Sequence, residues 1–179
     1  MLLVCAIAGV AVAIAMTPAP APAGKPSVSG ARLLAYEAAI TPTLQAAGSM
    51  VEQEIKPSIA SLQGGTLAVA QVRERAAGWS ARFAQARAAL AKVTVPREFA
   101  GAAALFDRAF VEYEAAVAPL GALIEGARAD AVTAAIDAAS AAARKADAVY
   151  DQAAAIIQAQ RRALGMGPTI DLPDPTATP

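Results

Sequence analysis

The residue types on which most enzymes and metalloproteins depend are scarce in this chain. Its 179 residues include no histidine and a single cysteine, Cys5. Without histidine the chain lacks a Ser-His-Asp triad, imidazole-ligated zinc or haem, and the Glu-x-x-His di-iron motif of helical bundles. One cysteine forms neither an internal disulfide nor a thiolate cluster. We therefore expect a protein that is not an enzyme and that has no catalytic residues, no cofactor and no metal.

Acidic residues are the remaining candidates for metal binding, and their spacing disfavours it. Glu112 and Glu114 are two residues apart, so they diverge on a helix and cannot chelate an ion by themselves. Asp147 and Asp151 are four residues apart and share a helix face, but Arg144 lies close to Asp147 on that face. This pattern predicts a surface charge network. A carboxylate-only metal site assembled across helices is the alternative.

Basic residues concentrate between positions 72 and 93, where the only acidic residue is Glu74. They are Arg73, Arg75, Arg82, Arg87 and Lys92. We take the four arginines as a candidate interaction surface, and the alternative is a solvated face that pairs with the more acidic segment after it. No aromatic residues outside the apolar stripe interleave with them, and the chain balances 15 basic against 15 acidic residues. We therefore expect no nucleic-acid partner.

The N-terminal residues 1–16 are typical of an export signal. Leu2 to Met16 are apolar without a break and span roughly 22 Å at helical rise, which is short of a full bilayer crossing. This length is typical of the apolar region of a secretory signal peptide. No Lys or Arg precedes the run, so a start farther upstream would make the segment an uncleaved signal-anchor. We expect an extracytoplasmic protein, secreted or tethered to the membrane through this segment alone.

Composition and periodicity predict a helical bundle behind that segment. Alanine supplies 52 of the 179 residues, which favours helix over sheet. Residues 17–30 form a Pro/Ala-rich linker of the kind that adopts polyproline II. Breaks at Gly64-Gly65, Pro96 and Arg128-Ala129-Asp130 then divide residues 31–164 into four amphipathic segments with short links. The sequence thus predicts an all-α fold, an up-down-up-down antiparallel four-helix bundle.

The apolar stripes of these segments predict the core. Steps of three and four residues lead from Val72 to Val93 and from Phe99 to Ile124. Five aromatic residues of these two stripes are the predicted centre of the core: Trp79, Phe83, Phe106, Phe110 and Tyr113.

Prolines and glycines predict the irregular places. Pro42 and Pro57 lie inside the first segment and predict kinks or a broken helix there, while Pro119 predicts a bend in the third. Gly165 ends the last helical pattern, so residues 165–179 are expected to form an irregular C-terminal tail.

Two stretches resemble a known group of proteins. Val95-Pro96-Arg97-Glu98-Phe99 precedes Phe106, Phe110 and Tyr113, and Val149-Tyr150-Asp151 leads to Arg161-Arg162-Ala163-Leu164-Gly165. Together with the signal-like segment and the Pro/Ala linker, these stretches resemble uncharacterised secreted or membrane-anchored, Ala-rich helical-bundle proteins of high-GC actinobacteria. The resemblance implies an extracytoplasmic helical bundle, and the group has no assigned activity to transfer.

These observations favour a non-enzymatic binding or structural module at the cell envelope, with an envelope protein as its partner. The alternative is a carrier or sensor of an apolar small molecule bound between the helices, where Pro42, Pro57 and Pro119 would splay one end. A continuous core would favour the first function. An enclosed apolar cavity beside these prolines would favour the second.

Overall fold

The computed structural model describes residues 29–167, and all the regular elements within them are helices. The elements are α1 (Gly30–Met50), the π-helical turn η1 (Val51–Ile55), α2 (Lys56–Gln63), α3 (Val69–Leu90), the 3₁₀ turn η2 (Arg97–Phe99), α4 (Ala100–Gly121) and α5 (Ala129–Ala163). Since α1, η1 and α2 follow one another directly, residues 29–167 form four helical rods. The predicted all-α class is confirmed for these residues, and the predicted signal segment and most of the linker and tail lie outside them.

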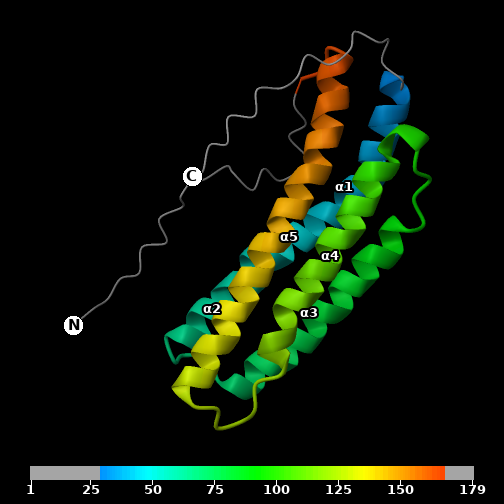
Figure 1. Cartoon of the computed structure of the whole chain (residues 1–179). Coiled ribbons are helices and arrows are strands. Elements are labelled where there is room, and N and C mark those ends of the chain that lie inside the picture. Colours follow the sequence, from blue (N-terminus) through cyan, green and yellow to red (C-terminus); the bar gives the residue numbers. More distant parts are fainter. Residues whose placement is uncertain (1–28, 168–179) are drawn as a thin grey trace, which may run out of the picture.

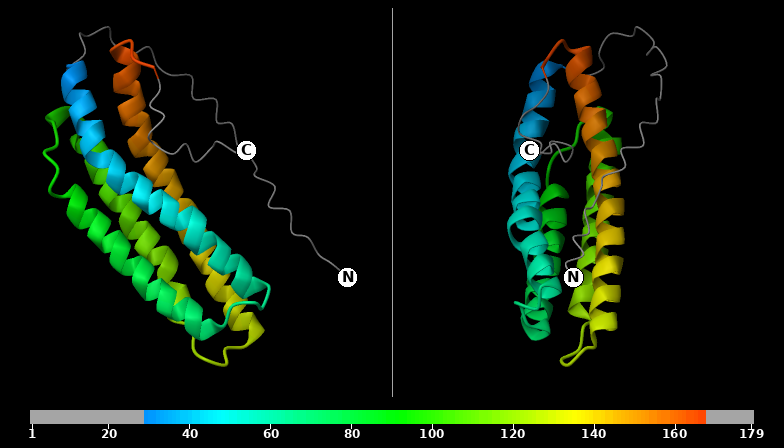
Figure 2. Two further views of the ribbon diagram at one scale, coloured as in Figure 1. Left: turned by 180° about the vertical axis from the view of Figure 1, so that it is seen from behind. Right: turned by 90° about the vertical axis from the view of Figure 1, so that its left-hand side faces the viewer.

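The four rods lie lengthwise beside one another and form an elongated body (Figures 1 and 2). The most extensive packing joins α4 to α5, followed by that between α3 and α4. The first rod completes the arrangement, because α1 and α2 each contact both α3 and α5. Residues at the two ends of the described chain therefore lie close together in space.

Local chemistry explains where the rods begin and end. The Ser29 side chain accepts a hydrogen bond from the Arg32 backbone N–H, so the first helix begins at Gly30, inside the predicted linker. Gly65, in the link before α3, has a φ of 69°. Gly165, just after α5, has a φ of 67°. Only glycine adopts these left-handed values at no steric cost, which is why the helical patterns stop there.

The first rod is irregular beside Pro57, whereas its helix is unbroken at Pro42. Pro42 lies inside α1, which continues through it without interruption. The irregularity is instead the π-helical turn η1, where the Lys56 backbone N–H bonds to the Val51 carbonyl five residues earlier. Pro57, at the first turn of α2, has no N–H to give to the Gln53 carbonyl, so the preceding turn can widen. Pro119 lies inside α4, two residues before the end of that helix at Gly121.

The core runs the length of the body and contains the predicted aromatic residues, with two corrections. Trp79, Phe83, Phe106 and Phe110 are fully buried. Tyr113 is half-buried at the edge, where its ring stacks on Phe83 with centroids 5.3 Å apart. Ile124, predicted to continue the third stripe, is 70% exposed because α4 ends at Gly121 and the chain has left the helix. Leu123 is buried in its place.

Candidate functional site

Two of the four candidate arginines turn toward the first rod. Arg82 of α3 forms a two-pronged ion pair with Glu54 of η1, with Nη1 to Oε1 at 2.7 Å. The Trp79 indole N–H donates to the same carboxylate at 3.3 Å. The hydrogen bond from Arg82 is the main reason that the pKa of Glu54 lies below its usual value. Arg75 donates from Nη1 to the buried Ser58 hydroxyl of α2 at 2.9 Å.

The other two candidate arginines differ from each other. Arg87, near the end of α3, pairs with Asp107 of α4, with Nε to Oδ1 at 2.8 Å, and its Nη1 lies 3.6 Å from the Glu114 carboxylate. This pairing is of the kind expected between the basic second segment and the acidic third. Arg73 is exposed and forms no hydrogen bond or ion pair within residues 29–167. Of the four predicted surface residues, Arg73 is thus the one whose guanidinium group remains available.

A buried ion pair joins the start of the first rod to the end of the last one. Arg161 of α5 donates from Nη1 to the Glu37 carboxylate of α1 at 2.5 Å. The two side chains are only 13% and 10% exposed. Arg161 also donates from Nε to the Gly167 carbonyl at 2.6 Å, which holds the chain after α5 against the helix end. The sequence did not predict this pair, because the two residues are 124 positions apart and no local pattern links them.

Together these contacts form a closed circuit of charge pairs around the four rods. A fourth pair, Lys145 of α5 with Glu112 of α4 at 2.8 Å, supplies the missing link. The circuit consists of Glu54–Arg82, Arg87–Asp107, Glu112–Lys145 and Arg161–Glu37. Each rod is therefore tied to both of its neighbours, and most of the basic residues predicted to bind a partner also hold the fold.

Two tyrosines lie at the interface between α4 and α5. The Tyr113 hydroxyl donates to the Asp147 carboxylate, and burial together with this negative neighbour raises the pKa of Tyr113. Burial also raises the pKa of Tyr150, whose hydroxyl has no hydrogen-bond partner within the described part of the chain. The sequence had placed Asp147 in a surface charge network with Arg144. The structure instead directs Asp147 to the neighbouring helix.

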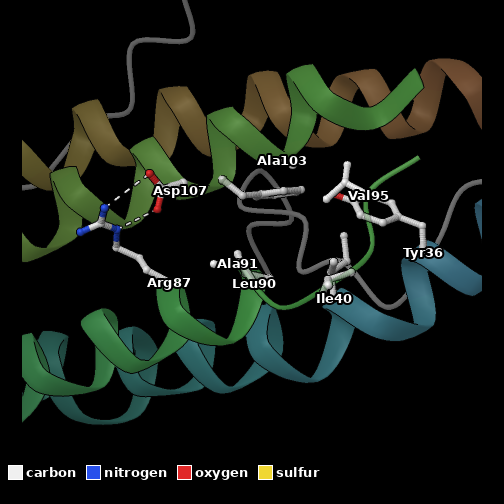
Figure 3. Close-up of a pocket in the computed structure, with 10 residues that line it drawn as sticks. Tyr36, Ile40, Arg87, Leu90, Ala91, Val95, Ala103 and Asp107 are labelled. Atoms are coloured by element: carbon white, nitrogen blue, oxygen red, sulfur yellow. Dashed lines mark hydrogen bonds and ion pairs between the residues drawn. The ribbon is translucent and has the colours of Figure 1, made fainter. Parts of the chain in front are cut away.

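A pocket of about 170 Å³ opens between α1, the end of α3, the link after it and α4 (Figure 3). Its lining is mainly apolar and includes Tyr36, Ile40, Leu90, Ala91, Val93, Val95, Ala103 and Phe106. The ion pair of Arg87 and Asp107 lies at one end, and Tyr36 and Val95 lie at the other. None of the prolines expected to splay the helices lines this pocket. No sequence signal located it, because its walls come from three helices and a link.

A second pocket, of about 290 Å³, lies beside the π-helical turn and is more polar. Pro57 lines it together with Glu54, Ser58 and Arg75, which already bond to neighbouring side chains. Within residues 29–167, no group of three or more acidic, cysteine or histidine side chains is placed to hold a metal ion. No helix in the same range is both long and apolar enough to cross a membrane.

Comparison of the chain with protein-family models, curated proteins and solved structures finds no match. The arrangement of its own side chains is therefore the basis on which a function is inferred.

Proposed function

We propose that this protein is a non-enzymatic structural or binding module of the cell envelope, an up-down-up-down antiparallel four-helix bundle that is exported or anchored by residues 1–16. The closed circuit of charge pairs around the four rods is the observation that carries the proposal. Consecutive rods run in opposite directions in Figure 1, and each neighbouring pair is tied by one ion pair of the circuit. This organisation favours a stiff body that presents a surface.

The surface proposed to meet an envelope partner is the exposed part of α3 around Arg73. Arg75, Arg82 and Arg87 bond to neighbouring rods, so their guanidinium groups are largely committed to the fold. Arg73 remains exposed and is free to pair with an acidic group on another protein. The proposed partner is therefore a protein with an acidic patch. The resemblance to secreted or anchored actinobacterial proteins agrees with an extracytoplasmic location.

The location is tested by interrupting the apolar run of the N-terminal segment. Val10→Asp together with Ala13→Asp places two charges in the stretch that would enter the membrane. We expect the unaltered chain in the envelope or medium of the native cell and the doubly substituted chain in the cytosol. The control carries the same charges in the tail, as Thr176→Asp with Thr178→Asp, and keeps the original location. Equal distribution of all three chains would contradict export through this segment.

The binding surface is tested by site-specific photo-crosslinking in intact cells. A photoreactive residue replaces Arg73 in one variant and Arg108, an exposed arginine of α4, in the control variant. We expect a discrete crosslinked envelope protein from position 73 and none from position 108. Crosslinking that is equal from both positions, or absent from position 73, would contradict the assignment of this surface.

A further inference from the structure

The two ends of the elongated body differ in charge, although the chain as a whole is neutral. One end gathers the start of α1, the link between α3 and α4, and the end of α5, at the top of Figure 1. Two contacts join these segments. Tyr36 of α1 stacks on Phe99 after the link, with ring centroids 5.0 Å apart, and Arg161 of α5 pairs with Glu37 of α1.

Four exposed basic side chains lie at this end, and we call them the basic end. They are Arg32 in the first turn of α1, Lys92 just after α3, Arg97 in η2 and Arg162 in the last turn of α5. Their side chains form no hydrogen bond or ion pair with any residue between 29 and 167. In the segments 29–40, 91–105 and 155–167 the acidic residues are Glu37, which pairs with Arg161, and Glu98. The positive charge of this end is therefore largely uncompensated.

The opposite end, where α2 leads into α3 and α4 leads into α5, has the reverse balance. Residues 52–75 and 122–137 contain six acidic side chains and four basic ones. In the sequence, Lys25 precedes α1, and Asp171 and Asp174 follow α5. When these three are counted with the basic end, and the pair of Glu37 and Arg161 is left out, five basic side chains remain against three acidic ones. The excess of positive charge at the basic end thus persists.

The basic end is also the end at which residues 1–28 lead into α1. Residues 17–29 would span about 40 Å as polyproline II, so a tether in residues 1–16 would allow the body either to touch the bilayer or to stand away from it. Basic side chains beside a tether are attracted to anionic lipid headgroups, within a Debye length of about 8 Å at physiological salt. The charge of the basic end favours contact when such lipids are present.

We propose that the basic end is a second membrane contact, which docks the body on the phosphate groups of anionic lipids beside the tether. Arginine suits this role because its guanidinium group forms paired hydrogen bonds with phosphate oxygens. The inference rests on the anchoring proposed above. With the 35 residues of α5 spanning about 52 Å, docking would hold Arg73, near the start of α3, far from the bilayer. The surface proposed to bind an envelope protein would then face away from the membrane.

Energy transfer to acceptor-labelled lipid tests the docking in the full chain. A fluorescent donor is attached at Ala100→Cys or at Ala122→Cys, two exposed positions at opposite ends of α4, in a chain that also carries Cys5→Ala. The vesicles contain phosphatidylcholine alone or an equimolar mixture with phosphatidylglycerol. We expect phosphatidylglycerol to raise transfer from position 100 more than from position 122, and high salt to reverse the rise. Transfer from position 100 that does not depend on phosphatidylglycerol would overturn the proposal.

Charge reversal tests whether the basic end itself makes the contact. Arg32→Glu with Arg97→Glu is expected to lower the ratio of docked to undocked body about 25-fold, since each surface arginine contributes about fivefold. Arg108→Glu with Arg144→Glu is the control, because it makes the same change in net charge at exposed positions outside the basic end and is expected to keep the docking. Equal losses in the two double variants would overturn the assignment of the contact to this end.

Flotation with the two kinds of vesicle separates this proposal from the anchoring on which it rests. A chain that floats with both vesicles but shows no effect of phosphatidylglycerol on energy transfer retains its anchor and contradicts the docking. A chain that floats only with phosphatidylglycerol vesicles supports the docking and contradicts the anchor. A chain that floats with neither contradicts both.

Discussion

Phe110 shows how much of the stability rests on single aromatic side chains. Its ring is 1% exposed and lies 6.1 Å from Phe83 and 6.5 Å from Tyr113, measured between ring centroids. Phe110→Ala is expected to lower the free energy of unfolding by about 3–5 kcal/mol, because the transfer and cavity costs add. Val111→Ala, at the next and 41% exposed position, is expected to change it by less than about 0.5 kcal/mol. Denaturant unfolding followed by circular dichroism measures both, and equal effects would contradict the assigned core face.

The buried pair of Glu37 and Arg161 allows a second test at the residue scale. Removing either partner leaves the other, largely buried charge without this ion pair, so Glu37→Leu and Arg161→Leu are each expected to lower the free energy of unfolding by about 3–5 kcal/mol. The double variant is expected to lose far less stability than the two single variants added together, because neither charge of the pair remains. The exposed pair of Lys56 and Glu52 is the control, with an expected coupling energy below about 1 kcal/mol. Additive effects at Glu37 and Arg161 would show that the two do not act as a pair.

Burial of individual residues could be predicted from the sequence where it follows from helical periodicity. Ion pairs between residues on different helices could not be predicted in this way. Phe83 and Phe106 repeat along one face of their helices, so their burial is visible in the sequence. Glu37 and Arg161 are 124 residues apart, and no local pattern links them. These long-range juxtapositions follow from packing and have no local signature.

At the scale of elements, the π-helical turn η1 is the irregular part of the first rod. Met50 and Ile55 are both buried although they lie five positions apart, a step that turns by about 140° around the axis of a regular α-helix. The extra residue of η1 absorbs the difference and keeps α1 and α2 facing the same core. Prolines suggested an irregular first rod, but they could not indicate its type. The spacing of buried residues was the better signal.

Deleting one residue tests this account of η1. Removal of the exposed Gln53 is expected to convert η1 to a regular α-helical turn, with less than about 1 kcal/mol lost. Removal of the exposed Ala77 from α3 is the control, and it rotates the rest of that helix by about 100° relative to its apolar stripe. We expect the second deletion to unfold the chain. Thermal melts measure the stability of both variants. If the variant without Gln53 is unfolded, the wide turn is required for folding.

For the whole molecule, the tyrosines predict a sharp response to alkali. The chain has three, and burial raises the pKa of each, to about 12 for Tyr36 from an ordinary value of 10.0. The neutral phenols favour the folded state fully below pH 10. This contribution is lost as the pH rises through the pKa of the folded protein, because the unfolded chain releases these protons first. We expect tyrosinate absorbance to stay low at pH 10 and then to rise together with loss of helix. Ordinary titration near pH 10 with the helices intact would contradict the burial of these rings.

The contact between Glu37 and Arg161 can form only after most of the chain has been synthesised. A ribosome adding about 5–20 residues per second needs roughly 6–25 s to synthesise the 124 residues between them. Until then α1 has neither its ionic partner nor the rod that covers its far side. The nascent chain therefore remains without a closed tertiary structure until its last helix emerges. For a chain that is exported as proposed above, this interval would preserve the unfolded form that a translocation channel accepts.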